Sequence, residues 1–184
     1  NAFDSKSLIV KVLFQECQNT KTIDKIIIQD EGEGISHNNV SSLFGSLGES
    51  WKKDAKKNGD RSLHGQFGKG RFKAFSLGEI VIWSTCIEDN GKYYKYSIKG
   101  NANNIKRFEI SEPSETNDKT KGTQVEIFNL VKHASSLATD SSKESITKEY
   151  ALYLTEYPHK KLFYDNAYIT PSDVWLDKKE YNLG

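Results

Sequence analysis

The sequence predicts an α+β domain in which one mixed, mainly antiparallel sheet packs under a few helices. Segments rich in branched and aromatic residues, which are typical of strands, outnumber the segments with helical periodicity. The turns between them carry the Gly, Asn, Asp and Pro residues that tight connections need. A length of 184 residues suffices for one domain with a hydrophobic core, and neither an internal repeat nor a low-complexity linker divides it.

The first third of the chain predicts two strands and a short helix. Ser7–Phe14 and Ile23–Asp30 should form an antiparallel pair, because only a polar turn separates them. Ser36 can cap a helix that follows the second strand. The apolar face of this helix comprises Val40, Leu43, Phe44 and Leu47. Residues 49–62 are polar and lysine-rich without periodicity, which predicts a long loop of the kind that is usually functional or disordered.

The rest of the chain predicts further strands, a helix and a hairpin. The strands are expected at Glu79–Glu88, Lys92–Gly100, Ile105–Ser111 and Thr123–Leu130. The helix spans Ser141–Tyr157 and ends before Pro158, which cannot continue it. Its inward-facing residues are expected to be Ile146, Tyr150, Leu152 and Tyr153. Lys161–Ile169 predicts a hairpin.

Composition argues against several classes of protein. The net charge of +1 creates no strong global attraction to nucleic acid or membrane. The lysine-rich stretch at 51–57 is better explained as a solvated charged run than as a nucleic-acid contact, although that alternative stays open. No apolar run approaches the roughly 18 residues of a transmembrane helix, and the start shows no signal-peptide pattern.

The cysteine and methionine content sets two further expectations. Cys17 and Cys86 share no motif spacing with each other or with the histidines, so we expect no zinc site and a reduced, cytoplasmic compartment. The chain begins at Asn1 and contains no methionine, so we expect it to be a piece of a longer protein.

The stretch "QDEGEGI" ends a predicted strand at Asp30 and continues with Gly32 and Gly34. One interpretation is a tight turn, since Asp and Gly are ordinary turn residues. The other is that Asp30 is held at the strand end as a hydrogen-bond acceptor, while the glycines let a flat ligand lie against bare backbone. A carboxylate in that position suits the exocyclic amine of adenine.

The stretch "HGQFGKGRFKAFSLG" places Gly65, Gly68 and Gly70 directly before a predicted helix. It matches neither the dinucleotide pattern Gly-x-Gly-x-x-Gly nor the Walker pattern, because Ser or Thr does not follow Gly-Lys. Bare amides and the positive end of a helix dipole would form an anion site, with Lys69 and Arg71 adding charge. A flexible loop followed by a helix is the alternative.

Two shorter motifs have no clear function when taken alone. Asn1 and Asp4 stand one helical turn apart and could face one side of a helix end, or could belong to a solvated terminal fringe. Gly122 and Thr123 open a strand and could form a plain junction between a loop and that strand.

In this order, "NAFD", "DEGEG", "GQFGKG" and "GT" resemble the motifs of the GHKL ATPases, the family of DNA gyrase, Hsp90-like chaperones, histidine kinases and MutL. The wording of the glycine loop and the tail is most similar to bacterial Hsp90-like ATP-binding proteins. The resemblance implies the Bergerat fold, an α+β two-layer sandwich. It also implies a single ATP-binding domain over residues 1–184, with an ATP lid at about 36–64 and a C-terminal helix and hairpin at 141–184.

The resemblance also implies roles for individual residues, with ATP and magnesium as cofactors. Asn1 matches the ligand of magnesium, a hard ion that prefers oxygen donors. Asp4 matches an acidic residue near the adenine and ribose, and Asp30 the aspartate that reads adenine. Thr123 matches a threonine that supports this aspartate through a water. The backbone beside the base is matched by Gly32, Gly34 and Ile35, and the phosphate loop by Gln66, Phe67, Gly68, Lys69, Gly70 and Arg71.

Two parts of the family's catalytic apparatus have no counterpart in this sequence. The general-base glutamate is expected one helical turn before Asn1, so no catalytic residue is assigned within the chain. The cation that reaches the γ-phosphate in the chaperone and MutL branches comes from a following domain. We therefore expect magnesium-dependent ATP hydrolysis by the full-length protein, and weak binding with little or no hydrolysis by the chain as given.

The resemblance implies a cycle in which lid closure over ATP is coupled to homodimerisation or to movement of further domains of the same chain. One alternative is an ATP-gated interaction or assembly module with negligible hydrolysis. A sensor histidine kinase catalytic domain is a further alternative, which the long lid and the wording of the glycine loop disfavour.

Overall fold

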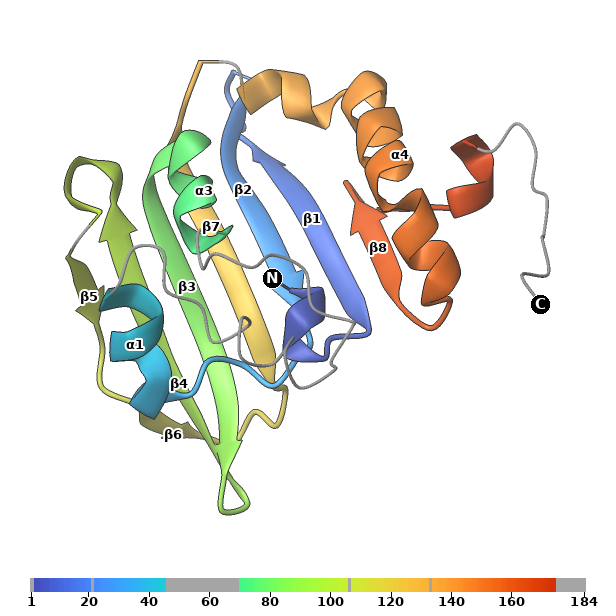
Figure 1. Cartoon of the computed structure of the whole chain (residues 1–184). Helices are drawn as coiled ribbons and strands as arrows, with labels where there is room; N and C mark the ends of the chain where they lie inside the picture. Colours follow the sequence, from blue (N-terminus) through green and yellow to red (C-terminus); the bar gives the residue numbers. More distant parts are fainter. Residues whose placement is uncertain (1, 21, 46–69, 106, 133, 175–184) are drawn as a thin grey trace.

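A computed structural model describes residues 2–20, 22–45, 70–105, 107–132 and 134–174. These residues form a nine-stranded sheet in the order β5-β4-β3-β7-β2-β1-β8-β9, with β6 also pairing with β4 (Figure 1). The strands are β1 (Ile9–Glu16), β2 (Ile23–Asp30), β3 (Gly78–Asp89), β4 (Lys92–Asn101), β5 (Phe108–Ile110), β6 (Ser114–Thr116), β7 (Gly122–Leu130), β8 (Lys161–Tyr164) and β9 (Ala167–Tyr168).

The strand pairing is antiparallel except between β1 and β8, which run parallel. Tight turns explain two of the antiparallel pairs. Asn90 and Gly91 join β3 to β4, and Asp165 and Asn166 join β8 to β9, all with positive φ angles that suit two-residue hairpins. The helix that precedes β8 connects it to β7, and this long connection allows β8 to lie beside β1 in the parallel direction. The predicted mixed, mainly antiparallel sheet is thus confirmed.

The described helices lie on one face of this sheet (Figure 1). They are α1 (Val40–Gly45), α3 (Gly70–Lys73) and α4 (Asp140–Glu156), together with short 3-10 turns that include η1 (Phe3–Ser5) and η2 (His37–Asn39). Phe44 of α1 packs in a core cluster around Trp83, while Leu154 of α4 packs in a second cluster around Leu162. Ile28 of β2 contacts both clusters, so one apolar layer joins sheet and helices into the expected α+β sandwich.

The helix α4 begins one residue before its predicted start, and Thr139 caps it by accepting a hydrogen bond from the Ser142 amide. The prediction that Leu152 faces inward is wrong, because its side chain is 82% exposed. Leu152 follows Ile146 by six residues, which rotates it by about 240° around the helix axis. The buried positions of this helix are Thr147, Ala151, Tyr153 and Leu154, with Ile146 and Tyr150 partly buried against the same cluster.

The outer edge of the sheet also differs from the prediction. The single strand expected at Ile105–Ser111 is shorter in the structure, and β6 forms from a segment expected to be only a turn. Both short strands pair with β4, and their side chains are largely exposed. Edge strands of this kind lack the buried alternation that marks a central strand, so the sequence pattern does not reveal their limits.

The helix expected after Ser36 is present as η2 followed directly by α1, and Val40 and Phe44 are buried as predicted. The expected inward residue Leu47 lies outside the described residues, as does most of the expected lid. Over the ranges that the structure describes, no helix combines the length and the apolar character needed to cross a membrane.

Candidate functional site

A row of polar side chains crosses four neighbouring strands at one end of the covered face. Asp30 of β2 pairs in register with Thr123 of β7, Thr123 with Thr85 of β3, and Thr85 with Tyr96 of β4. The next row on the same face is apolar and consists of Ile28, Val125, Trp83 and Ile98. Because side chains alternate between the faces of a sheet, all of these groups lie on the side that carries the helices.

The carboxylate of Asp30 is held in place by local hydrogen bonds. Its Oδ1 atom accepts from the backbone N–H of Gly32 at 2.9 Å and from the hydroxyl of Ser5 at 3.2 Å, a hydroxyl whose single hydrogen is shared with the Ala2 carbonyl at 2.6 Å. Burial raises the pKa of this carboxyl above its ordinary value, and bonds from Gly32, Ser5 and the Thr123 backbone oppose that shift only in part. A carboxylate that is fixed and partly desolvated is a strong, directional acceptor for an N–H donor.

Gly32 and Gly34 are both required by close approaches within the protein itself. A Cβ atom at Gly32 would lie 2.0 Å from the Oγ of Ser5. Gly34 has a φ of +75°, and a Cβ atom there would lie 2.4 Å from the carbonyl oxygen of Cys86 on β3. Packing of the chain around Asp30 therefore leaves no room for a side chain at either position, whether or not these glycines also contact a ligand.

The chain that leaves Asp30 is tied back to the sheet by Thr85 and Tyr96. The Ile35 amide donates to Thr85 Oγ1 at 2.9 Å, and the Tyr96 hydroxyl donates to the Ile35 carbonyl at 2.5 Å. Thr85 Oγ1 also donates to the Gly122 carbonyl at 3.1 Å and lies 3.2 Å from Thr123 Oγ1. Thr85 therefore joins the "DEGEGI" motif to the "GT" motif.

Thr85, Tyr96 and Ser5 are site residues that the sequence analysis missed. Strand alternation offers a signal for Thr85, because it places this hydroxyl on the same face as Val81 and Trp83, where an apolar side chain is expected. Thr85 is only 3% exposed. Ser5 carries no comparable signal, since it lies in a short polar stretch near the start of the chain.

The turn η1 packs directly against the segment that follows Asp30. The Glu33 amide donates to the Ser5 carbonyl at 3.0 Å, in addition to the bond between the Ser5 hydroxyl and Asp30. Asp4, in the same turn, is buried, and its negative charge helps to raise the pKa of Tyr153 on α4, after the larger effect of burial. The charge of Asp4 thus acts on α4, while the hydroxyl of Ser5 bonds to Asp30.

The predicted site residues other than Asp4 therefore divide into three groups. The structure brings together Asp30, Gly32, Gly34, Ile35 and Thr123. Gly70 begins α3, so a helix does follow the glycine loop. The side chain of Arg71 lies outside what the structure describes, as do Asn1 and residues 66–69. The predicted magnesium ligand and most of the predicted phosphate loop therefore have no described geometry.

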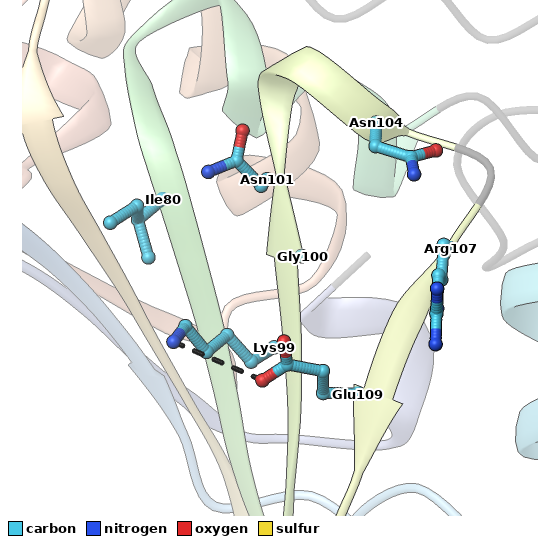
Figure 2. A pocket seen from close by; sticks show the side chains of 7 residues that line it. All are labelled: Ile80, Lys99, Gly100, Asn101, Asn104, Arg107 and Glu109. Atoms are coloured by element: carbon cyan, nitrogen blue, oxygen red, sulfur yellow. Dashed lines mark ion pairs between the residues drawn. The ribbon is translucent and has the colours of Figure 1, made fainter.

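In the described ranges, no group of three or more His, Cys, Asp or Glu side chains could hold a metal ion. A hollow of about 190 Å³ lies over β3, β4 and β5, where Lys99 and Glu109 form an ion pair at 3.9 Å (Figure 2). Ile80, Lys99 and Asn101 alternate with core-facing neighbours, so they lie on the face opposite to Asp30. This hollow is separate from the polar row.

Comparison with protein families identifies the chain. The family model of the histidine kinase-, DNA gyrase B- and HSP90-like ATPases matches residues 1–136. The chain belongs to this GHKL-type ATPase family. No curated protein matches the chain. The matched range of this GHKL ATPase domain includes the whole polar row, but it ends before α4, β8 and β9.

Proposed function

We propose that this GHKL ATPase domain binds ATP with the adenine ring against Asp30. The observation that carries the proposal is the carboxylate of Asp30, which is fixed through Oδ1 by Gly32 and Ser5 and lies in register beside Thr123. The family match supports a nucleotide as the ligand, and it covers all of these residues. In this arrangement Oδ2 of Asp30 accepts the exocyclic N–H of adenine.

The same geometry favours adenine over guanine. Adenine presents an N6 amino donor, whereas guanine presents the O6 acceptor at the equivalent position. An acceptor facing the Asp30 carboxylate would be repelled, and the carboxylate would lose its donor. The nearby hydroxyls of Thr85 and Thr123 supply further polar partners, either directly or through water.

For the triphosphate we propose the glycine loop that precedes α3, with Gly68, Lys69, Gly70 and Arg71 as its residues. Asn1 would hold a magnesium ion through its side-chain oxygen. This assignment fits the donor type, because Mg²⁺ is commonly held by one or two protein oxygens together with phosphates. When bound, magnesium would neutralise phosphate charge during transfer of the γ-phosphoryl group.

We propose that residues 1–184 act as a single domain, with residues 36–64 closing over bound ATP. The continuous sheet supports this unit, since β8 pairs with β1 along four registered positions. Closure coupled to homodimerisation or to movement of further domains, and hydrolysis by the full-length protein, are part of the proposal. Release of inorganic phosphate by the full-length protein tests the hydrolysis step separately from binding.

The binding step is tested by titrating the chain calorimetrically with ADP and with GDP, each with and without magnesium. We expect measurable ADP binding and at least about tenfold weaker GDP binding, because one hydrogen bond to a charged acceptor is worth about 1.5–3 kcal/mol. Equal affinity for the two nucleotides would contradict the role of Asp30 as the adenine acceptor. Absence of ADP binding would contradict the proposed function itself.

A further inference from the structure

A lysine from the last quarter of the chain is buried beside the turn that supports Asp30. Lys160 lies between α4 and β8, and only 7% of it is exposed. It stands outside residues 1–136, which match the ATPase family. The adjacent amide of Lys161 donates to the carbonyl of Leu8 at 2.7 Å, so the backbone here is fixed against the start of the chain.

The ammonium group of Lys160 joins α4 to η1. Its Nζ atom donates to the Tyr153 hydroxyl at 2.6 Å and to the Phe3 carbonyl at 3.3 Å. It also lies 5.5, 5.2 and 5.3 Å from the ring centroids of Phe3, Tyr153 and Tyr157. A buried ammonium is costly unless hydrogen bonds and π faces surround it, and these contacts supply both.

The turn that Lys160 holds is the same turn that contacts the proposed adenine site. Phe3 and Ser5 are the first and last residues of η1. The Ser5 hydroxyl donates to Asp30 Oδ1, and the Ser5 carbonyl accepts from the Glu33 amide. A continuous series of contacts therefore leads from Lys160 through η1 to both ends of the Asp30–Glu33 segment.

We propose that Lys160 is a positioning residue for the nucleotide site. By fixing the Phe3 carbonyl, it holds η1 in the position from which Ser5 orients the Asp30 carboxylate. This inference rests on the proposed binding of adenine at Asp30. The chain after residue 136, which lies beyond the family match, would then help to shape the site in addition to completing the sheet.

The central test is ADP affinity in the Lys160→Met variant, which keeps an unbranched side chain that is one atom shorter but removes its donors. We expect Kd for ADP to rise at least about tenfold. Tyr164→Phe is the matched control. Tyr164 belongs to the same core cluster as Tyr153, and its hydroxyl donates to the Leu137 carbonyl. None of its described hydrogen bonds reaches η1. We expect its ADP affinity to stay within about twofold of the wild-type value.

A double-mutant cycle with Ser5→Ala separates positioning from general destabilisation. If Lys160 acts through Ser5, the double variant should lose little more affinity than the more severe single variant. Additive losses would overturn the proposed route. Wild-type affinity in Lys160→Met would overturn the positioning role alone, whereas a wild-type protein without ADP affinity would overturn the proposed function and this role together.

A second measurement covers the case in which Lys160→Met does not fold. Tyr153→Phe keeps the ring but removes one partner of the ammonium, and its backbone amide exchange is measured without ligand. We expect faster exchange at Glu33, whose amide bonds to Ser5, and unchanged exchange at Ile127 in the centre of the sheet. Equal acceleration at both amides, or none at either, would overturn the proposal.

Discussion

The substitution Asp30→Asn separates the chemical role of this side chain from its structural role. The amide oxygen of Asn can replace Oδ1 and keep the bonds from the Gly32 amide at 2.9 Å and the Ser5 hydroxyl at 3.2 Å. The Nδ2 donor then stands where Oδ2 accepts the adenine amine in the proposed complex. Binding loses a charge-assisted hydrogen bond of about 1.5–3 kcal/mol, and two donors are left facing each other at a further cost of about 1–3 kcal/mol. The smaller values of these two costs add to about 2.5 kcal/mol, so we expect Kd for ADP to rise by at least about 60-fold.

Stability should respond in the opposite sense. Because burial raises the pKa of Asp30, the ionised carboxyl is less favourable in the folded protein than in the unfolded chain at neutral pH. A neutral amide that keeps the Oδ1 bonds removes that unfavourable contribution. The Tm of Asp30→Asn should therefore equal or exceed that of the wild type.

The assay combines ADP calorimetry with thermal unfolding of the same samples. Asp24→Asn is the matched control, because it removes one carboxylate from the same strand at an exposed position. Its ADP affinity should match the wild type. The reasoning is refuted if Asp30→Asn binds ADP as tightly as the wild type, or if its loss of binding accompanies a lower Tm.

Three further predictions concern the same region. ADP affinity should fall as pH is lowered through the raised pKa of Asp30, in a window that begins above its ordinary value of 3.8. Over the same window, protonation of Asp30 should stabilise the unliganded fold, because the folded state binds this proton more tightly than the unfolded chain. Calorimetry measures the affinity and urea unfolding the stability at each pH. Gly34→Ala and Gly91→Ala both place a Cβ atom on left-handed backbone. The added Cβ atom clashes with neighbouring atoms at Gly34 but meets none within 4 Å at Gly91. Urea unfolding should find Gly34→Ala at least about 1 kcal/mol less stable than Gly91→Ala, and equal stability would contradict the close approach. Thr85→Val should lower the free energy of unfolding by about 1–3 kcal/mol because it leaves the partly buried backbone amide of Ile35 without its acceptor. Thr147→Val, whose hydroxyl donates to a carbonyl within its own helix, should lose less than about 1 kcal/mol in the same urea assay.

Much of the sheet was predictable because its central strands are regular. The predicted strand Ile23–Asp30 coincides with β2, and Thr123–Leu130 differs from β7 by one residue. Both combine branched residues with flanking turn signals. The short edge strands were not predicted correctly, because exposed edges are decided by partners elsewhere in the chain. The error at Leu152 has a local cause, since this residue lies about 240° around the helix axis from Ile146.

For the candidate site, the motifs were predictable but their supports were not. Asp30, Gly34 and Thr123 stand in recognisable motifs, and their registered placement depends on β2 pairing with β7. Thr85 and Ser5 contribute hydroxyls from outside the four motifs. Strand alternation marks Thr85 as an unusual polar residue, but no local pattern identifies the distant groups that either hydroxyl contacts.

The sequence by itself determined the fold class, the order of four motifs and the end of a strand at Asp30, because periodicity, turn chemistry and motif order are local properties. The tertiary structure alone decided which polar groups meet Asp30. Strand register placed Thr85 and Thr123 in one row, and burial next to η1 placed Lys160, which is 157 residues from Phe3, in hydrogen-bond contact with that turn. Contacts of that kind arise from packing distant segments into one core, where each buried polar group needs a partner that the folded chain alone can bring to it.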